Sequence, residues 1–249
     1  CNLLILESWY RNRMYVKNIF RALRYKNYRL FFGGQSVSLV GTWMQKIAMS
    51  WLVYRLTGSV FLLGIVGFTG QIPTFLFAPI AGVLADRWNK RKILVITQIV
   101  AIAKALCLAL LVMTNTIQVW QIVSLSVILG IINAFDIPAR QSFVVEMIEC
   151  REDLGNAIAL NSSMVNGARL LGPSIAGVLI AAVGEGLCFL INGLSYIGVI
   201  WALLAMDICP KENHAAKRDI LHNLKEGISY AFGFAPIRSV ILLLGLVSL

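Results

Sequence analysis

Long apolar runs alternate with short polar segments along this chain. Six of the runs match the roughly 20 residues that a helix needs to cross the hydrocarbon core of a membrane. A seventh begins near Ser239, and we expect it to be a truncated span over 239–249. The pattern predicts an all-α polytopic membrane protein, with a six-span bundle over 30–206 and the start of a seventh span. The six runs are 30–54, 59–85, 93–113, 117–135, 157–183 and 187–206.

Polar segments flank the predicted bundle. Residues 1–29 form an N-terminal segment, and because Met14 opens a stretch that is typical of a natural start, we expect residues 1–13 not to be native. Residues 207–238 form a polar connection, in which apolar residues at helical spacing predict a short amphipathic helix on the membrane surface. Within the second run, Pro73 and Pro79 predict a kink, since proline removes a backbone hydrogen-bond donor.

The composition agrees with a membrane protein, since 58% of the residues are hydrophobic and 14% are charged. Soluble domains are typically about 45–50% apolar and about 25% charged. The net charge of +10 is distributed between the apolar runs and not over one face of a domain, so we expect no nucleic-acid partner. The five cysteines form no C-x-x-C pair, which predicts free thiols, no metal site and no cofactor.

The predicted spans contain no enzymatic constellation. The two histidines, His214 and His222, lie in the polar connection, which excludes a membrane-embedded serine–histidine pair. The sequence contains neither the H-E-x-x-H motif of zinc proteases nor the G-x-x-x-x-G-K-[ST] motif that binds phosphate in ATP-driven pumps. We therefore expect no enzyme, but either a transporter or a non-transporting membrane scaffold or assembly protein.

Lysine and arginine are concentrated in alternate connections. Of the 22 such residues, 18 lie in the segments 1–29, 86–92, 136–156 and 207–238. The opposite connections hold only Arg55. Because positively charged connections stay in the cytoplasm, this distribution predicts a cytoplasmic N-terminus in a multi-pass protein of the plasma membrane.

The second of these segments contains an acid that topology does not explain. In GVLADRWNKRK (82–92), retention of positive charge accounts for Arg87, Lys90 and Arg91 but not for Asp86. Gly82 and Asp86 are four residues apart and share one face of a helix. Such a face admits a close neighbouring helix and places a carboxylate beside its N-terminus. On spacing alone, an ordinary helix end with an incidental aspartate is an equal alternative.

This stretch resembles the signature of the major facilitator superfamily, G-x-L-A-D-R-x-x-[KR]-[KR], between a second and a third span. The resemblance implies that the motif gates the cytoplasmic side by docking against a helix of a second half. The superfamily usually has glycine where Asn89 stands, and asparagine also tolerates a left-handed backbone. The gating residues carried over are Gly82, Asp86, Arg87, Lys90 and Arg91.

Other stretches resemble the enterobactin-exporter-like, transmembrane secretion effector branch of this superfamily. They are GTWMQ (41–45), WLVYRLTGS (51–59), FDIPARQSFV (135–144) and ARLLGPSIAG (168–177). The resemblance implies a secondary exporter of the bacterial inner membrane, an antiporter of small molecules such as siderophores or drugs. It also implies alternating access with a second six-span half as partner, and protons as the candidate coupling ion.

The last of these stretches is also similar to the antiporter motif of fifth spans, G-P-x-x-G-G, with Ala176 in place of one glycine. Small residues at Ala168, Gly172 and Ala176 recur every four residues, which predicts close packing of a neighbouring helix on that face. A packing stripe without a mechanistic role is the alternative. The motif residues are Ala168, Gly172, Pro173 and Gly177.

Polar residues inside the spans predict a wall of a transport cavity. In the first span, five of them fall within an arc of about 100° at 3.6 residues per turn, and hydrogen bonding between helices is the alternative. We expect Asp136 to cap a short helix beyond the fourth span. The predicted cavity residues are Gln35, Ser38, Thr42, Gln45, Lys46, Lys104, Asn133, Asn166 and Arg169.

Three of these residues, Lys46, Lys104 and Arg169, are cations, and no aspartate or glutamate lies deep in the six predicted spans. A buried cation is costly unless it finds a partner. The candidate partners are backbone carbonyls, carboxylates of a second half, or the substrate, and snorkelling of Lys104 to the membrane surface is a further alternative. If the substrate contributes, the cargo is anionic.

Overall fold

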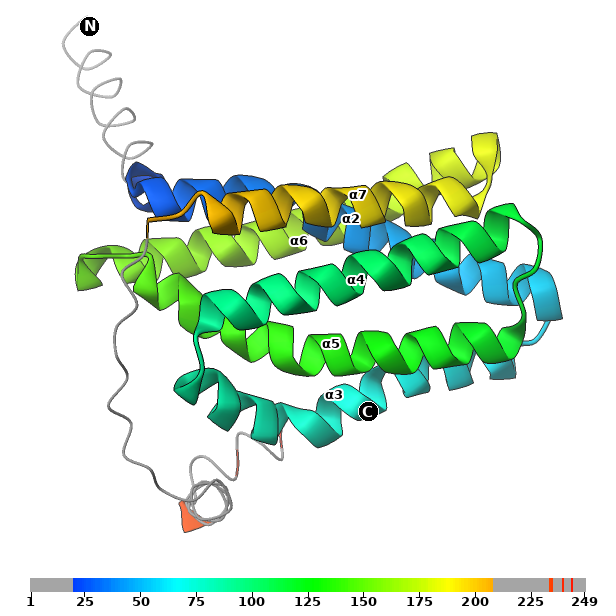
Figure 1. The fold of residues 1–249 in the computed structure, drawn as a ribbon, viewed down its shortest axis with the longest axis horizontal. Helices are drawn as coiled ribbons and strands as arrows, with labels where there is room; N and C mark the ends of the chain where they lie inside the picture. Colours follow the sequence, from blue (N-terminus) through cyan, green and yellow to red (C-terminus); the bar gives the residue numbers. More distant parts are fainter. Residues whose placement is uncertain (1–19, 208–232, 235–238, 240–242, 244–249) are drawn as a thin grey trace, which may run out of the picture.

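The computed structural model describes residues 20–207 without interruption, together with residues 233, 234, 239 and 243. The predictions about residues 1–13, about an amphipathic helix within 207–238 and about the seventh span concern residues outside this description. Residues 20–207 form a short 3-10 helix and six long α-helices (Figure 1). Their bounds are η1 Arg21–Arg24, α2 Lys26–Thr57, α3 Val60–Arg87, α4 Lys90–Met113, α5 Val119–Glu146, α6 Arg151–Val183 and α7 Glu185–Leu204.

The six long helices correspond to the six predicted spans. Five of them, α3 to α7, are long and apolar enough to cross a membrane. Helix α2 lies outside this set because polar residues such as Gln45 and Lys46 lower its hydropathy. It packs against α6 and α7 and runs beside them (Figure 1), so it passes through the same layer as its two neighbours.

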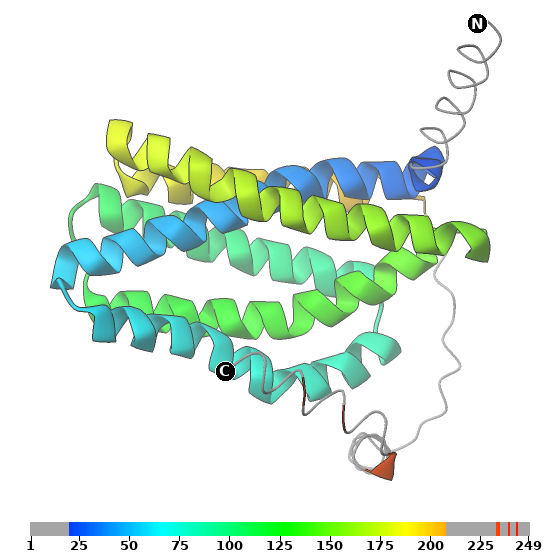
Figure 2. The same cartoon turned by 180° about the vertical axis from the view of Figure 1, so that it is seen from behind.

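The largest departure from the predicted spans is at the end of α5. The fourth span was expected to end at residue 135, whereas α5 continues through Pro138 to Glu146. Helix α3 likewise continues through Pro73 and Pro79, and it bends along its course (Figure 2). Prolines are tolerated inside membrane helices because neighbouring helices and side chains satisfy the freed backbone groups. The prolines therefore shape these two helices without ending them.

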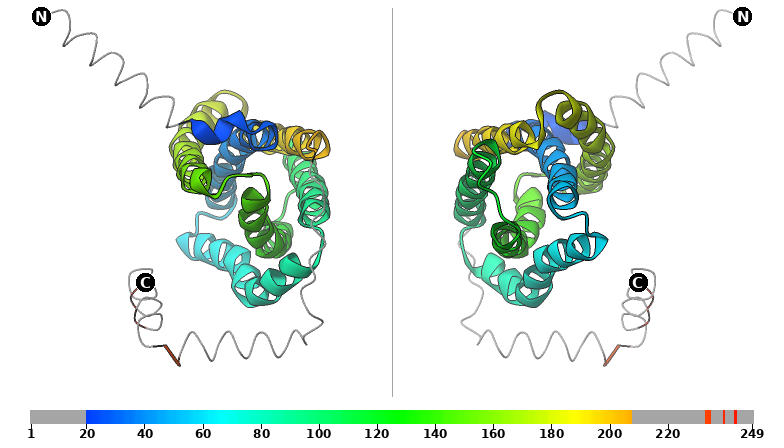
Figure 3. Two further views of the ribbon diagram at one scale, coloured as in Figure 1. Left: turned by 90° about the vertical axis from the view of Figure 1, so that its left-hand side faces the viewer. Right: turned by 90° about the vertical axis from the view of Figure 1, so that its right-hand side faces the viewer.

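The helices form an open arc when they are seen from the end (Figure 3). Helix α2 packs between α6 and α7, α7 packs against α4, α4 against α5, and α5 against α3. Helices α6 and α3 therefore stand at the two ends of the arc. Only 11% of the most apolar stretch of α3 and 22% of that of α6 are buried, against 44% to 50% in α4, α5 and α7. Much apolar surface of α3 and α6 is thus left open by the described chain.

The crossing of α3 and α5 depends on glycine. A Cβ atom placed on Gly130 would lie 2.6 Å from the carbonyl oxygen of Gly70 and 2.9 Å from Cδ of Pro73. The Thr74 hydroxyl donates a hydrogen bond of 2.8 Å to the Gly130 carbonyl. The two backbones therefore approach more closely than any larger residue at position 130 would allow.

Apolar residues form one cluster near each end of the bundle. One contains Tyr28, Phe31 and Phe143, and the other contains Leu52 and Phe189. Two much smaller clusters of buried residues are separate from these: Ala101, Ala105, Ile132 and Tyr196, and, between α2 and α6, Leu39, Met164 and Ala168. The apolar core is therefore smaller away from the two ends, and polar side chains are buried there.

The two ends of the bundle differ in their connections. At the end where α2, α4 and α6 finish, the chain reverses in short turns whose backbones reach positive φ at Gly58, Asn115 and Gly184. We call this the turn end. The other end carries η1, the first residues of α2 and α4 and the last residues of α5 and α7. We call it the basic end, because Arg21, Lys26, Lys90, Arg91 and Arg151 lie there.

Candidate functional site

Buried polar side chains of α2, α4, α5 and α7 lie between the two apolar clusters. Burying a polar group costs free energy unless it is hydrogen-bonded, so these side chains need partners among other side chains, the backbone or a ligand. They are Gln35, Ser38, Gln45, Thr97, Gln98, Lys104, Ser126, Asp136 and Asn192.

Helices α2 and α7 are joined by a network of neutral side chains. The Asn192 amide donates to Gln45 Oε1 at 2.7 Å and to the Tyr196 hydroxyl at 3.2 Å. The Tyr196 hydroxyl also lies 3.2 Å from Thr42 Oγ1. A Cβ atom on Gly41 would lie 2.5 Å from Asn192 Oδ1, so glycine at position 41 makes room for this amide.

Sequence reasoning missed Asn192 and Tyr196, although both stand four residues apart in an otherwise apolar helix. Of the predicted α2 stripe, Gln35, Ser38 and Gln45 are buried and Thr42 is partly buried. Hydrogen bonding between helices, which was the alternative for this stripe, holds for Thr42 and Gln45. Contact of the stripe with a substrate stays a prediction.

Asp136 does not cap a helix, and that expectation is wrong. It lies inside α5, buried, where Arg140 pairs with it at 2.7 Å from one turn further along the helix. From α4, the Gln98 amide donates to Asp136 Oδ1 at 2.9 Å, and the Thr97 hydroxyl lies 3.1 Å away. These partners compensate a carboxylate inside the bundle. The expectation that no acid lies deep in the spans is corrected by this residue.

The predicted deep cations occupy two different environments. Lys104 is only 4% exposed, and within residues 20–207 it has neither a hydrogen bond nor an ion pair. It lies beside Ala101 and Ala105, which belong to one of the two smaller clusters. Lys46 and Arg169 are exposed instead, and both lie over the ring of Trp43. Nothing in the sequence alone indicated this shared ring, since α2 and α6 had first to be placed side by side.

The remaining predicted cavity residues stay apart from these groups. Asn133 is partly buried on α5. Asn166 is exposed on α6, where its amide donates to the Ser162 carbonyl of its own helix at 2.9 Å. The structure therefore brings the predicted cavity residues together only in part.

The predicted gating motif spans the α3–α4 connection at the basic end. The Lys90 ammonium donates to Glu146 Oε1 at 2.5 Å, and Arg91 donates to the Leu204 carbonyl at 2.7 Å. These bonds connect the start of α4 to the ends of α5 and α7. Gly82 has open space around it, since an added Cβ would meet nothing within 4 Å in the described chain.

The other motif positions are arranged as follows. Asp86 lies in the last turn of α3, and Arg87, the last residue of that helix, is partly buried. Asn89 has φ of −65°, so it does not adopt the left-handed backbone that asparagine tolerates. Its side chain instead accepts a hydrogen bond from the Lys92 amide at 3.1 Å and caps α4. This cap explains the asparagine without any special backbone conformation.

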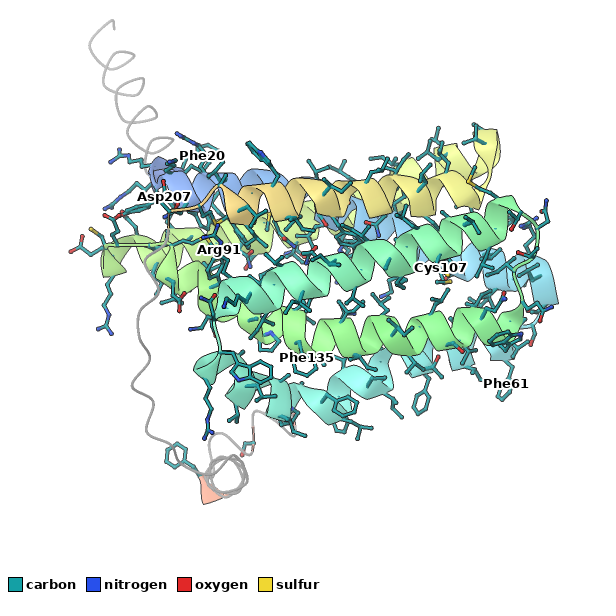
Figure 4. All side chains as sticks on the ribbon, in the orientation of Figure 1. Phe20, Phe61, Arg91, Cys107, Phe135 and Asp207 are labelled. Atoms are coloured by element: carbon teal, nitrogen blue, oxygen red, sulfur yellow. The ribbon has the colours of Figure 1, made fainter. Side chains whose placement is uncertain are left out.

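Ion pairs connect distant segments at the basic end. Arg21 pairs with Asp153 at 2.8 Å, and the Tyr25 hydroxyl donates to the same carboxylate at 2.9 Å. Hydrogen bonding to Cys150 and to Asp153 raises the pKa of Tyr25 to about 12. Lys26 pairs with Asp207 at 2.7 Å, and this hydrogen bond lowers the pKa of Asp207. Figure 4 shows Arg91 and Asp207 at this same end of the bundle.

The segments that were expected on one side of the membrane therefore do meet at one end, as far as residues 20–207 reach. At the turn end, Arg55 pairs with the buried Glu185.

The antiporter-like motif places its small residues against α2. Ala168 and Ala176 are buried, and a Cβ on Gly172 would lie 2.5 Å from Trp43 Cβ and 3.0 Å from the Met44 amide nitrogen. The predicted close packing on this face is confirmed. Pro173 is partly buried, and Gly177 is exposed with nothing within 4 Å of an added Cβ.

A family model described as transmembrane secretion effector matches residues 18–247. The chain belongs to the transmembrane secretion effector family of the major facilitator superfamily. This membership and the apolar helices make it a multi-pass membrane protein of a transporter family.

Curated relatives in this superfamily are transporters. The chain is 28% identical to the staphyloferrin A transporter of Staphylococcus aureus over 68% of its own length and 42% of the relative's. It is 26% identical to macrolide efflux protein A of Streptococcus pyogenes over 73% of its length and 44% of the relative's. It is 29% identical to multidrug resistance protein MdtG of Enterobacter lignolyticus over 72% of its length and 47% of the relative's. The chain thus spans less than half the length of these transporters.

Proposed function

We propose that the complete protein is a secondary active exporter of small molecules such as siderophores or drugs. This chain supplies its first six spans, and a second six-span half completes it. The observation that carries the proposal is a membrane bundle of a transporter family whose middle buries amides, hydroxyls, a carboxylate and a lysine between two apolar clusters. A membrane scaffold has no need of such a polar middle, whereas a transport path has.

The second half is proposed to cover the open arc. Helices α3 and α6 are its least buried members, and the chain matches 42% to 47% of the length of the relatives named above. Movement of the two halves about a central site would give alternating access. The predicted cavity residues on α2, α4, α5 and α6 would then contribute to that site.

The gate is proposed to lie at the basic end, where α3 meets α4. The open face at Gly82 leaves room for a helix of the second half, and Asp86 stands on the same face one turn later. Lys90 and Arg91 tie this turn to α5 and α7, so it would move together with the bundle. We expect Asp86→Asn in the complete protein to slow transport while leaving membrane abundance unchanged.

The basic end is proposed to face the cytoplasm of a bacterial cell. A single cysteine at Asn89 should then be protected from a membrane-impermeant maleimide in intact cells, and one at Thr116 should be labelled. All five native cysteines, which include the exposed Cys107 and Cys150, must be replaced first. Labelling at position 89 in sealed cells would reverse the proposed orientation.

Coupling is proposed to be antiport with protons. Asp136 is a buried carboxylate of the described helices, and it is the first position to test. Asp136→Asn keeps an oxygen acceptor for Gln98 but removes the titratable charge. We expect loss of the dependence of transport on a proton gradient, with Glu152→Gln, which removes an exposed carboxylate at the start of α6, as the matched control.

The decisive experiment is efflux by the complete protein. Cells that express it should accumulate less of at least one compound from a panel of macrolides, cationic dyes and polycarboxylate siderophores than cells with an empty vector. Collapse of the proton gradient should abolish the difference. A membrane-inserted protein that moves no member of the panel, and whose deletion alters assembly of other membrane proteins, would favour the scaffold function instead.

A further inference from the structure

Two cations from different helices share the ring of Trp43. The Lys46 ammonium nitrogen lies 4.9 Å from the ring centroid, and Arg169 Cζ lies 5.4 Å from it. Lys46 and Trp43 stand on α2, and Arg169 stands on α6. Each cation is attracted to the aromatic π system, so both are placed around one indole.

The indole that holds them is itself fixed by packing. Trp43 packs in a cluster with Leu39, Met164 and Ala168 from the same two helices. A Cβ atom on Gly172 would lie only 2.5 Å from Trp43 Cβ, so α6 presses directly against this residue. The ring is therefore a platform with little freedom, and the positions of the two cations follow from it.

These charges lie far from either membrane surface. Trp43 is about 25 Å of helix rise from the start of α2 and about 21 Å from its end, at 1.5 Å per residue. Arg169 is about 27 Å and about 21 Å from the ends of α6. Cations at such depth are costly against lipid, since their side chains are too short to reach the headgroups. This face must therefore meet water, protein or a charged ligand.

Five acids of the described chain are engaged elsewhere, and Glu149 and Glu152 lie exposed at the basic end. Asp136 pairs with Arg140, Glu185 with Arg55 and Asp153 with Arg21. Glu146 pairs with Lys90 and Asp207 with Lys26, both at the basic end. Within residues 20–207, neither Lys46 nor Arg169 forms an ion pair, although both are exposed. The middle of the bundle is consequently left with uncompensated positive charge on α2 and α6, and Lys104 adds to it from α4.

We propose that Lys46, Trp43 and Arg169 form a binding site for a carboxylate-bearing aromatic or otherwise planar part of the cargo. The arginine fork can hold a carboxylate by two parallel hydrogen bonds, and the lysine adds a point charge. The indole offers an apolar surface for a planar group beside that carboxylate. This inference rests on the proposed transport function and adds the chemical class of the cargo to it.

The test uses two xanthene dyes of opposite charge on the purified complete protein in lipid nanodiscs. Fluorescence anisotropy measures binding of carboxyfluorescein, an anion with carboxylates, and of rhodamine 123, a cation. We expect carboxyfluorescein to bind more tightly. The double variant Lys46→Gln and Arg169→Gln should weaken carboxyfluorescein binding by about tenfold or more, since each charged hydrogen bond lost is of that order. Binding of rhodamine 123 should be unchanged or stronger.

Two further variants separate binding from folding. Arg151→Gln removes an exposed cation at the start of the same helix α6 and should leave both affinities unchanged. Lys46→Arg keeps the charge and should retain most of the affinity for carboxyfluorescein. Thermal unfolding of every variant should match the unsubstituted protein, because Lys46 and Arg169 are exposed.

Several outcomes would overturn the proposal. They are absence of carboxyfluorescein binding, preference for rhodamine 123, and equal carboxyfluorescein affinity in the double variant and the unsubstituted protein. The last of these would mean that carboxylates of the second half neutralise the two cations. Because the measurement is of binding, it can fail while efflux of other compounds succeeds, and it can succeed in a protein that transports nothing.

Discussion

Helix α2 uses polar chemistry differently toward its two main neighbours. Toward α7 it buries the neutral Gln45, which bonds to Asn192. Toward α6 it meets small residues, and Lys46 lies exposed over the same indole as Arg169. In the contact with α7, the polar side chain of α2 is hydrogen-bonded within the protein. In the contact with α6, the charge of Lys46 stays exposed. A polar residue in a membrane helix is therefore informative about ligands only after its partners within the protein have been identified.

A substitution in the close contact between α2 and α6 should have the largest effect on the free energy of unfolding. Gly172→Leu should destabilise the complete protein by about 3 kcal/mol, because the new side chain would meet the backbone of α2, which cannot shift cheaply. Gly177→Leu is the matched control, since open space surrounds that glycine. Thermal unfolding in detergent measures both. Equal destabilisation by the two changes would show that the small-residue face does not set the contact.

Removing the hydrogen bond between α2 and α7 should destabilise the protein by a smaller amount. Asn192→Leu leaves the buried Gln45 oxygen without its donor, and we expect a loss of about 1–3 kcal/mol. Asn166→Leu is the control, because that amide is exposed and bonds within its own helix. A double-mutant cycle with Gln45→Leu should show coupling, and strict additivity would contradict the proposed pairing.

The exposed ion pair between Lys26 and Asp207 should contribute least to the free energy of unfolding. The hydrogen bond from Lys26 lowers the pKa of Asp207, so its stabilising contribution is present at neutral pH. It should be lost as the pH falls through the pKa of the carboxyl group in the folded protein. Lys26→Gln should raise that pKa toward the ordinary aspartate value, as measured by NMR titration of the Asp207 carboxyl carbon. An unchanged titration would mean that the pair does not form in solution.

The helical architecture could be predicted because run length and positive charge are local properties of a sequence. The same local criterion failed at Asp136, where a charged residue next to a proline was taken as the end of a span. The helix continues there because Gln98 and Arg140 compensate the carboxylate. Gln98 reaches Asp136 only through the packing of α4 against α5, which cannot be inferred from hydropathy.

The sequence predicted several residues of the candidate site, but not how they are arranged or bonded. The spacing of Gln45 and Lys46 showed that both lie on one stripe, but not that one is bonded to α7 while the other is exposed. Asn192 was missed because a single amide hardly changes the hydropathy of α7. The role of Trp43 required the juxtaposition of Trp43 and Arg169, which lie more than a hundred residues apart in the sequence.

Helices that are far apart in the sequence pack against each other in this bundle, and this has a consequence for biosynthesis. Helix α2 is made before α3 to α7, yet its main partners are α6 and α7, and its bond to Asn192 spans 147 residues. It is also the long helix that falls short of the hydropathy of a membrane span. During synthesis Gln45 must therefore stay without this partner until α7 emerges. A nascent chain released before Glu185 would lack the helix that pairs with Gln45, and α2 would keep an unpaired amide in the membrane.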